Sequence, residues 1–419
     1  MSLTLKKFTP EHGLTVTVPA SKSILNRALL LAAFSRKRVK IICGNLSEDT
    51  RAMVGCLNAL AIPCRIEQDC IWVQGCATPP NSHAALDVKS AGTVARFLCV
   101  ALAFKGGDYR FTASEQMARR PMQILNLLEE NGVKFDWLDK KYTFPFLLHS
   151  NKTEIKDYFL VDTDTSTQYA SGILLSAPFR ENPTTLQLTG KRTHGGYIAM
   201  TQSLLDAFGA KYERTDDTIR IFPSLRAPDV YEVEADLSGA CYFFALALLF
   251  SMRVFVKNAK LSGMQSDIGF IKLLQKKGII FTQTDDGLLC DASEIKSYSG
   301  FDADMNDFSD QTLTAAVLAP FATTPSSLKN IAHIAKQESN RINAVIENLT
   351  SLGVKAVTDG KNITIYPSEI HKGKIKTYGD HRVAMSFALI ALKTGHVEID
   401  DPSCCKKTFE NYFDILTNL

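Results

Sequence analysis

SKSILNRALLLAAF, residues 21–34, is the first of six similar segments whose spacing decides the fold. Each segment opens with polar residues and continues as an apolar, small-residue-rich run of helical length. The other five are SAGTVARFLCVALAF from Ser90, STQYASGILLSAPF from Ser166, SGACYFFALALLF from Ser238, SDQTLTAAVLAPFA from Ser309 and DHRVAMSFALIAL from Asp380. Their first residues are separated by 69, 76, 72, 71 and 71 positions. A rhythm this even predicts six copies of one supersecondary unit.

Four of the units contain a second marker, an amphipathic helix pattern that ends at a glycine. The glycines are Gly132 in LLEENGVKF, Gly209 in LLDAFGAKY, Gly278 in LLQKKGIIF and Gly353 in LTSLGVKA. Glycine at this place supplies the left-handed residue that ends a helix. The first unit has LNALAIPC instead, and the last ends within FENYFDILTNL.

Short runs rich in β-branched residues lie between the helical segments and are typical of strands. They are LTVTVP (14–19), KRVKIICG (37–44), TTLQLTG (184–190), TIRIFP (218–223), RVFVKNA (253–259) and NITIYP (362–367). The pattern predicts an α/β fold in which each unit packs two helices on a sheet, one of them apolar nearly all round and therefore buried. Two lobes of three units each agree with the usual size of a domain.

Composition excludes several classes of protein. The chain has 419 residues, and its 47 Lys and Arg against 44 Asp and Glu leave a net charge of +3, too balanced for a general nucleic-acid binder. No apolar run reaches the roughly 18 residues of a membrane helix. The first residues lack the apolar core of a secretory signal, so we expect a cytoplasmic protein.

Motifs of several common chemistries are missing from the sequence. The ten cysteines form no CxxC pair, which favours reduced, buried thiols over a zinc site. The chain has no phosphate-binding P-loop, no GxGxxG, no GxSxG and no HExxH. Nucleotide binding of those types, the common hydrolase nucleophile and a metal centre are therefore disfavoured.

The polar residues at the starts of the six apolar segments carry the chemistry. Ser21, Ser90, Ser166, Ser238, Ser309 and Asp380 are all good N-cap residues. The first turns also contain groups that capping does not require: Lys22, Arg27, Arg96, Gln168, Asp310, His381 and Arg382. A charge that opens a buried helix is costly unless it is paired or serves a ligand.

A helix N-terminus with added cations is suited to anions, because its free N–H groups and the helix dipole favour negative charge. Further cations stand on loops, at Arg119, Arg120, Lys336, Arg341, Lys406 and Lys407. We therefore expect a cationic cleft between two lobes and small, multiply anionic substrates.

Two carboxylates stand within this cationic set and suggest acid–base chemistry. Asp310 opens the fifth apolar segment, and Glu338 lies in AKQESNR beside Arg341. A carboxylate among cations is biased to its charged form and makes a base, whereas one in a drier place holds a proton and serves as an acid. Taken alone, an Asp at a helix start such as Asp310 is more often a cap than a catalytic group.

Eight short motifs in this order resemble the 5-enolpyruvylshikimate-3-phosphate synthase family over essentially the whole chain. They are PASKSILNRALLLAA (19–33), AGTVAR (91–96), RRP (119–121), STQ (166–168), DMNDFSDQ (304–311), QESNR (337–341), YGDHRVAM (378–385) and KKTF (406–409). The resemblance implies a two-lobed enolpyruvyl transferase fold of six βαβαββ units around pseudo-threefold axes. The first lobe is expected to span residues 20–234, and the second residues 1–19 plus 235–419.

The family resemblance implies transfer of the enolpyruvyl group of phosphoenolpyruvate to the 5-hydroxyl of shikimate 3-phosphate, with release of phosphate. No metal or organic cofactor takes part, the enzyme is expected to be a monomer, and the family is the target of glyphosate. By matching position, the residues that hold phosphoenolpyruvate are Lys22, Gly92, Arg120, Gln168, Arg341, Arg382 and Lys407, supported by His381.

The same resemblance implies the acceptor site and the catalytic groups. Residues matched to shikimate 3-phosphate are Ser23, Arg27, Ser166, Thr167, Gln168, His194, Tyr197, Asp310, His333 and Gln337. Asp310 resembles the base that takes the 5-hydroxyl proton. Glu338 resembles the acid that protonates the methylene carbon, with Lys22 as a helper.

Departures from the family pattern fall mostly on the acceptor side. His194 stands where the family commonly has a serine, His333 replaces an asparagine and Gln337 a lysine. Ser90 also replaces an asparagine, before Ala91. A neutral histidine or glutamine still forms hydrogen bonds to a phosphate or hydroxyl, so shikimate 3-phosphate stays the favoured acceptor.

Two other functions share part of this pattern. A UDP-N-acetylglucosamine enolpyruvyl transferase has the same fold and donor, but it normally carries a loop cysteine before the position of Arg120, and no cysteine lies between Cys99 and Cys241. A non-catalytic repeat protein that binds RNA or another polyanion would require a broad basic surface, which the balanced charge opposes.

Overall fold

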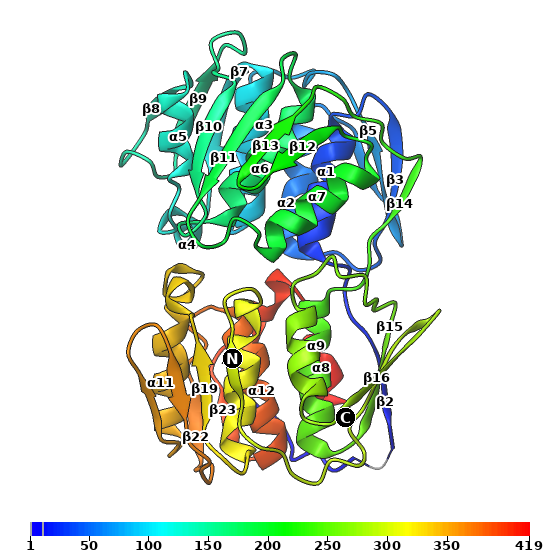
Figure 1. Cartoon of the computed structure of the whole chain (residues 1–419), viewed down its shortest axis with the longest axis vertical. Helices are drawn as coiled ribbons and strands as arrows, with labels where there is room; N and C mark the ends of the chain where they lie inside the picture. Colours follow the sequence, from blue (N-terminus) through cyan, green and yellow to red (C-terminus); the bar gives the residue numbers. More distant parts are fainter. Residues whose placement is uncertain (1, 11) are drawn as a thin grey trace. The chain divides into compact units, whose positions relative to one another are not determined.

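The computed structural model describes residues 2–10 and 12–419, and its strands form six small sheets. The chain divides into two compact units, one formed by residues 20–233 and the other by residues up to 19 together with 234–419. Each unit contains three of the sheets (Figure 1). Among the described residues, no helix has both the length and the apolar character to cross a bilayer.

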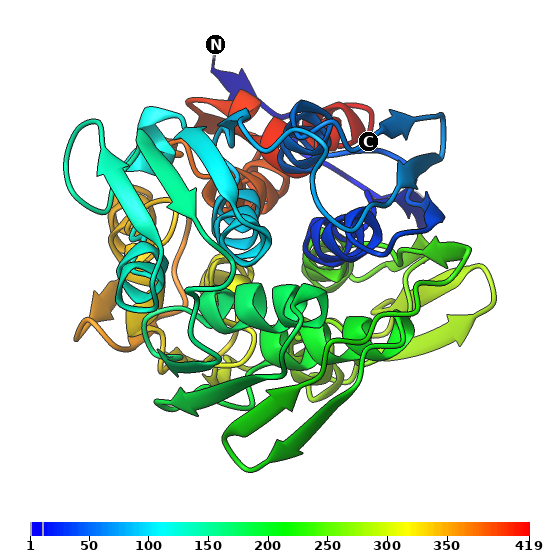
Figure 2. The ribbon, with the colours of Figure 1, turned by 90° about the horizontal axis from the view of Figure 1, so that it is seen from above.

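The unit of residues 20–233 has three four-stranded sheets, ordered β14-β3-β5-β4, β6-β7-β9-β8 and β10-β11-β13-β12. Figure 2 shows its strands at the outside and its helices inside. Its helices and strands, in chain order, are α1 (Lys22–Ala33), β3 (Arg38–Ile42), α2 (Glu48–Ala59), β4 (Cys64–Ile66), β5 (Cys70–Gln74), β6 (Ala85–Asp87), α3 (Gly92–Lys105), β7 (Gly107–Thr112), α4 (Glu115–Ala118), α5 (Ile124–Glu130), β8 (Lys134–Trp137), β9 (Phe146–Ser150), β10 (Tyr158–Asp162), α6 (Thr167–Ser176), the 3-10 turn η1 (Ala177–Phe179), β11 (Thr184–Thr189), α7 (Gly196–Ala207), β12 (Tyr212–Thr215), β13 (Thr218–Ile221) and β14 (Val230–Glu232).

The other unit has two four-stranded sheets, β16-β17-β15-β2 and β18-β19-β21-β20, and the three-stranded sheet β1-β23-β22. Its elements are β1 (Leu3–Thr4), β2 (Leu14–Thr17), α8 (Leu237–Phe250), β15 (Arg253–Lys257), α9 (Ile268–Gln275), β16 (Ile280–Thr284), β17 (Gly287–Asp291), β18 (Asp302–Asp304), η2 (Ser309–Gln311), α10 (Thr312–Leu318), η3 (Ala319–Phe321), β19 (Ser326–Lys329), η4 (Ala332–Lys336), α11 (Arg341–Ser351), β20 (Ala356–Thr358), β21 (Ile363–Ile365), β22 (Gly373–Ile375), α12 (His381–Thr394), β23 (Val397–Ile399), η5 (Pro402–Lys407) and α13 (Tyr412–Thr417).

One pairing pattern recurs in the sheets and confirms the predicted βαβαββ unit. In the sheet of β10, the pair β10–β11 is parallel, and β11–β13 and β12–β13 are antiparallel. A parallel pair requires a crossover, which α6 provides, whereas the antiparallel pair β12–β13 closes as a hairpin. The sheet of β18 repeats the order, with β18–β19 parallel and β19–β21 and β20–β21 antiparallel.

Three sheets are completed by strands that are distant in sequence. β14 pairs in parallel with β3, and β2 pairs in parallel with β15. The last sheet lacks the hairpin of the other five, and β1 pairs there antiparallel with β23, from Leu3↔Ile399 to Thr4↔Glu398. The N-terminal strands therefore belong to the unit that contains the C-terminal half of the chain.

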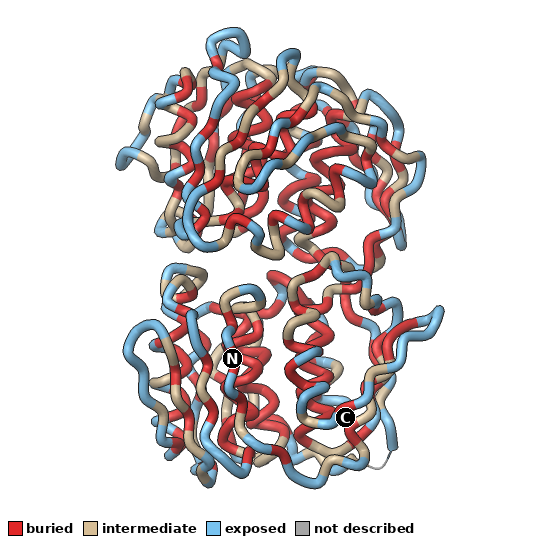
Figure 3. Tube along the Cα trace, viewed as in Figure 1, coloured by how far each residue is buried: buried red, intermediate tan, exposed pale blue. Residues whose placement is uncertain are grey.

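The apolar helices form the cores, as the sequence predicted. Thirteen of the 14 residues of α3 and of α8 are buried, and so are 12 of the 14 residues of α12. Figure 3 shows the buried stretches following these helices, with exposed residues on loops and outer strands. All ten cysteines are free thiols, and eight of them are buried.

The second helix of most units ends in a left-handed residue. Gly132, Gly209, Gly278 and Gly353 have φ of 104°, 63°, 90° and 83°. The first unit, which lacks the glycine, adopts the same turn with Ala61 at φ 58°. Its hydrogen bond from the Ile62 N–H to the Leu57 carbonyl, 3.0 Å, matches that from Ala210 to Leu205, 2.9 Å. The structural repeat is thus retained where the sequence marker is missing.

Replacing Ala61 by glycine is therefore expected to stabilise the protein. An L-residue in the left-handed region costs roughly 1–2 kcal/mol, partly offset by the greater freedom of glycine in the unfolded chain, so Ala61→Gly should gain about 1 kcal/mol. Ala61 is exposed, so packing is unaffected. Urea denaturation measures the change.

Gly278→Ala is the matched control for this substitution. Its added Cβ would meet only the end of the Ile295 side chain, at 3.1 Å, so the main cost is the positive φ. A loss of about 1 kcal/mol is expected. A destabilised Ala61→Gly variant would contradict the interpretation.

Candidate active site

In the unit of residues 20–233, polar contacts join the N-terminal turns of α1, α3 and α6. The Asn26 amide of α1 donates to Thr93 Oγ1 of α3 at 2.9 Å, and Arg96 of α3 donates to Gln168 Oε1 of α6 at 2.6 Å. Arg27 of α1 reaches Ser171 of α6 at 3.2 Å. Three helix N-termini therefore come together, as the sequence pattern suggested, and with their cations they suit an anion.

Arg27 is a buried cation held by neutral partners. The residue is 1% exposed, and it donates from Nε to Thr201 Oγ1 at 2.9 Å and from a terminal nitrogen to the Ser23 carbonyl at 2.7 Å. The rings of Phe97 and Tyr197 lie 5.0 and 5.7 Å from its guanidinium carbon. Burial among these neutral groups lowers the pKa of Arg27 to about 10. An anionic ligand would compensate its charge.

Lys22 and Gly92 lie in the first turns of α1 and α3. Lys22 Nζ forms an ion pair with Asp49 of α2, 3.1 Å away. A Cβ built on Gly92 would stand 2.7 Å from an Arg96 nitrogen and 2.9 Å from one of Arg120. Any side chain at Gly92 would therefore push on two guanidinium groups.

The predicted acceptor residues of this unit differ in their surroundings. Ser166 caps α6 by accepting a hydrogen bond from the Gln168 N–H at 3.3 Å, and Thr167 is buried behind it. The ring of His194 is 69% exposed, 3.1 Å from Thr193 Oγ1 and 3.9 Å from Asp217. Its exposure leaves His194 open to solvent and to ligands.

In the other unit, Arg341 at the start of α11 is the centre of a buried charge network. It is 1% exposed, and its nitrogens lie 2.8 Å from Asp380, 2.8 Å from Glu338 and 3.1 Å from Asp310. Its burial alone would lower the pKa of Arg341, but the charges of Asp380, Glu338 and Asp310 raise it above the ordinary value. The two predicted catalytic carboxylates are therefore brought together on one guanidinium.

Two more predicted cations contact the same carboxylates. Arg382, at the start of α12, lies 2.9 Å from Asp310, and Lys407 Nζ of η5 lies 3.4 Å from Glu338. His381 is 2% exposed beside Asp380, with Nδ1 3.8 Å from its carboxylate. Each carboxylate thus faces two cations.

Two predicted acceptor residues of this unit have protein partners. His333 Nε2 lies 2.7 Å from Ser309 Oγ, and the Gln337 side-chain oxygen accepts a hydrogen bond from Arg341. Gln337 is therefore hydrogen-bonded to the same guanidinium, that of Arg341, that pairs with Asp310.

The expected N-cap positions are correct at Ser21, Ser166 and Asp380 and wrong at Ser90, Ser238 and Ser309. Ser21 occupies the cap of α1 without a side-chain hydrogen bond, and Ala91 takes the place expected for Ser90. Ser238 lies inside α8, which Asp236 caps two residues earlier. Ser309 opens a 3-10 turn, and its hydroxyl faces His333. Ser238 and Ser309 are engaged by side chains from other elements, which capping preference alone does not reveal.

Several functional groups were missed because their partners are distant in sequence. Asp380 was expected only as a cap, yet it also accepts hydrogen bonds from Ser339 at 2.9 Å and from Arg341. Asp49 had no signal beyond its place in the first turn of a helix. Within residues 2–10 and 12–419, no group of three or more His, Cys, Asp or Glu side chains is arranged to hold a metal ion.

Removal of Asp380 is expected to destabilise the protein strongly. Asp380 is 0% exposed, so Asp380→Ala deprives the buried Arg341 of one of its two countercharges at 2.8 Å and leaves α12 without its cap. Breaking a buried pair from one side costs about 3–5 kcal/mol. Urea denaturation tests this, with Glu369→Ala, an exposed carboxylate of the same unit, as control. Equal midpoints for the two variants would contradict it.

Comparison with known proteins gives one consistent family. The sequence profile described as EPSP synthase (3-phosphoshikimate 1-carboxyvinyltransferase) matches residues 12–416. A 3-phosphoshikimate 1-carboxyvinyltransferase 2 of Halalkalibacterium halodurans is 33% identical, with 97% of this chain and 91% of that protein covered. A 3-phosphoshikimate 1-carboxyvinyltransferase of Yersinia pestis is also 33% identical, covering 100% of this chain and 98% of that protein.

Solved structures agree with this result at the level of the fold. EPSP synthase from Acinetobacter baumannii superposes with a TM-score of 0.81 at 20% identity, over 99% of this chain and 97% of that one. The enolpyruvyl transferase NikO from Streptomyces tendae gives 0.74 at 17% identity, over 100% and 97%. Because the profile matches residues 12–416 and a relative of 33% identity covers 97% of the chain, this chain belongs to the EPSP synthase (3-phosphoshikimate 1-carboxyvinyltransferase) family.

Proposed function

We propose that the protein transfers the carboxyvinyl group of phosphoenolpyruvate to the 5-hydroxyl of shikimate 3-phosphate and releases phosphate. The family membership supports this reaction. The observation that carries the mechanism is the placement of Asp310 and Glu338 on one buried guanidinium, that of Arg341, beside Arg382 and Lys407. This cluster combines two proton-transfer groups with cations for an anionic donor.

Glu338 is proposed to give a proton to the methylene carbon of phosphoenolpyruvate, which leaves C2 as an oxocarbenium-like cation. The acceptor hydroxyl attacks C2 as Asp310 takes its proton, which forms a tetrahedral adduct. Loss of phosphate and of one methyl proton then gives the enol ether product. The cations stabilise the negative charge that develops on the departing phosphate.

The proposed residues fall into two sets, one for each substrate. For phosphoenolpyruvate they are Lys22, Gly92, Arg120, Gln168, Arg341, Arg382 and Lys407, supported by His381. For shikimate 3-phosphate they are Ser23, Arg27, Ser166, Thr167, Gln168, His194, Tyr197, Asp310, His333 and Gln337. Arg27 is suited to an anionic ligand because its protein contacts are neutral hydroxyl, carbonyl and aromatic groups.

The first test is phosphate release from phosphoenolpyruvate with one acceptor at a time. Release with shikimate 3-phosphate, and none with UDP-N-acetylglucosamine or without acceptor, is the expected outcome. Release with UDP-N-acetylglucosamine alone would overturn the acceptor assignment. Salt-sensitive RNA binding with no phosphate release would instead favour a polyanion-binding protein.

A second test removes the two proton-transfer groups. Asp310→Asn and Glu338→Gln should each lower kcat by about 10²-fold or more, because amides keep the shape of the side chain but exchange no proton. Isothermal titration of phosphoenolpyruvate in the presence of shikimate 3-phosphate should show that binding is largely kept. Turnover close to wild type in both variants would remove them from these roles.

We also propose that the protein acts as a cytoplasmic monomer without nucleic-acid partners, with residues 20–234 as one lobe and residues 1–19 plus 235–419 as the other. The balanced net charge of +3 supports the absence of nucleic acid. Analytical ultracentrifugation would test the monomer, since a dimer has twice the 46.2 kDa mass of one chain.

A further inference from the structure

Asp267 is a buried carboxylate that the proposed reaction does not use. It precedes α9 and occupies the N-cap position, but its side chain accepts no capping hydrogen bond from that helix. The residue is 5% exposed. A carboxylate buried at this depth requires partners elsewhere, and its partners therefore indicate its role.

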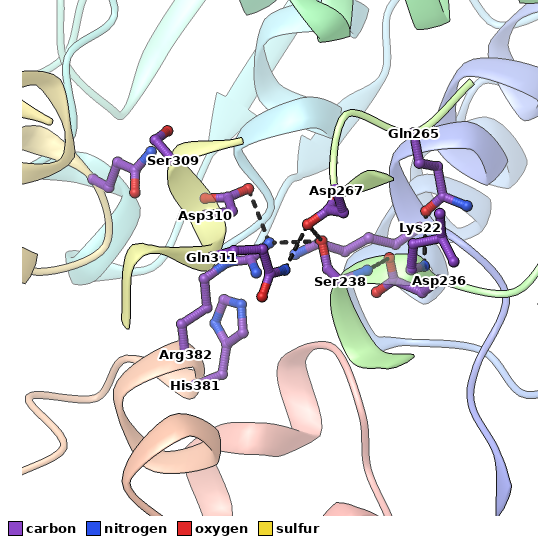
Figure 4. A network of polar contacts seen from close by, with 12 residues as sticks. Lys22, Asp236, Ser238, Gln265, Asp267, Ser309, Asp310, Gln311, His381 and Arg382 are labelled. Atoms are coloured by element: carbon purple, nitrogen blue, oxygen red, sulfur yellow. Dashed lines mark hydrogen bonds and ion pairs between the residues drawn. The ribbon is translucent and has the colours of Figure 1, made fainter. Parts of the chain in front are cut away.

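Two hydrogen-bond partners of Asp267 lead toward the charge network of Arg382 and Asp310. Its Oδ1 accepts a hydrogen bond from Ser238 Oγ at 2.9 Å and another from Gln311 Nε2 at 2.5 Å. Ser238 lies in the first turn of α8, and Gln311 ends the 3-10 turn η2. Figure 4 shows the Asp267 carboxylate with these two side chains directed toward it.

The first branch runs through Ser238 to Arg382. Because the Ser238 hydroxyl gives its only proton to Asp267, its oxygen is left as an acceptor, and an Arg382 terminal nitrogen lies 3.4 Å away. The same nitrogen of Arg382 lies 2.9 Å from Asp310 Oδ2. Asp267 thus sets the direction of the Ser238 hydroxyl, which faces Arg382, a residue proposed to bind phosphoenolpyruvate.

The second branch runs through Gln311 to the turn that carries Asp310. Gln311 is 0% exposed, and its amide is fixed at both ends, since Nε2 donates to Asp267 and Oε1 accepts from Thr314 Oγ1 at 2.9 Å. Asp310 is its neighbour in the same three-residue turn. Fixing Gln311 therefore fixes the backbone from which Asp310 projects.

The charges around Asp267 agree with such a role. Burial raises the pKa of Asp267, the positive charge of Arg382 opposes this rise, and the negative charge of Asp310 adds to it. The Asp267 carboxylate therefore interacts electrostatically with both Arg382 and Asp310. One terminal nitrogen of Arg382 contacts both Asp310 and Ser238, and Ser238 in turn donates to Asp267.

We propose that Asp267 is a positioning residue for the reaction, which aligns Arg382 through Ser238 and Asp310 through Gln311. The inference rests on the proposed function, because it assigns Asp267 to the phosphoenolpyruvate-binding and proton-transfer groups. In metal sites, residues that orient the ligating side chains from behind change affinity or activity by about 10–100-fold when removed, and we expect an effect of this order for Asp267. Asp267 touches no substrate in this role.

The test compares steady-state kinetics of Asp267→Ala, Asp267→Asn and Ser238→Ala with wild type, varying each substrate in turn. Asp267→Ala should raise KM for phosphoenolpyruvate about tenfold or more and lower kcat. KM for shikimate 3-phosphate should stay within about twofold in Ser238→Ala, since Ser238 faces Arg382 on the donor side of the site. In Asp267→Ala it should rise as well, because the Gln311 branch holds Asp310, a proposed acceptor residue. Asp267→Asn keeps an oxygen that accepts hydrogen bonds, and should recover part of the activity.

Ser238→Ala keeps the inference testable if removal of the buried carboxylate prevents folding. It should also raise KM for phosphoenolpyruvate. In the double variant with Asp267→Ala, the effects should be less than additive, because both changes interrupt one branch. Full additivity would overturn the Ser238 branch.

Gln265→Ala is the matched control. Gln265 is 1% exposed in the same loop and also holds the start of α8, where it accepts from the Leu237 N–H at 2.9 Å, but its hydrogen bonds go to Leu237, Glu234 and Ala235 and not to the Arg382 network. It should lower the thermal midpoint and leave KM for phosphoenolpyruvate unchanged. An equal rise in Gln265→Ala and Asp267→Ala would mean that Asp267 is merely structural.

The outcomes separate this inference from the proposed function. If the wild-type protein turns over both substrates, and Asp267→Ala and Ser238→Ala have the same KM and kcat as wild type, the inference is overturned and the proposed function is not. A wild-type protein that releases no phosphate with shikimate 3-phosphate would overturn the proposed function, and the inference with it.

Discussion

The need to bury six apolar helices along almost their whole length is the constraint on which the rest of the structure depends. A helix surrounded by protein has no wet face for polar residues, so polar groups are confined to its ends. In each unit the buried helices meet near their N-terminal turns, through Arg27–Ser171 and Arg96–Gln168 in one and Arg382–Ser238 in the other. The packing that forms the cores therefore also gathers free N–H groups and cations in one place.

The two units compensate their buried arginines in opposite ways. Arg27 donates hydrogen bonds to hydroxyl groups and a carbonyl and lies over aromatic rings, whereas Arg341 forms ion pairs with Asp380, Glu338 and Asp310. The first arrangement leaves a positive charge for a ligand to balance, and the second holds carboxylates ready within a cationic cluster. Binding and proton transfer thus depend on the same elementary cost, that of a charge removed from water.

The fold was largely predictable because its signal is periodic. The six apolar segments became the buried helices α1, α3, α6, α8, α10 and α12, and the β-branched runs became strands. The site was predictable only as residue types at helix starts. That Asp310 and Glu338 share Arg341 depends on contacts between residues up to 31 positions apart, which no local pattern encodes. The same reason explains why the sequence showed no sign of the roles of Asp49 and Asp267 or of the second role of Asp380. Ala61 shows that the left-handed turn forms even in the unit that has no glycine at this place.

The pairing of β1 with β23 and of β2 with β15 has a consequence for how the chain is made. The unit of residues 20–233 draws all its strands from one continuous segment, so its three sheets are complete once β14 has been synthesised. The other unit holds its first two strands at the N-terminus, and they wait unpaired until residues 253–257 and 397–399 emerge. Contacts this distant in sequence form late and slowly. The unit that begins first during translation is therefore the one that is completed last. This is the unit that contains Asp310, Glu338 and Arg341.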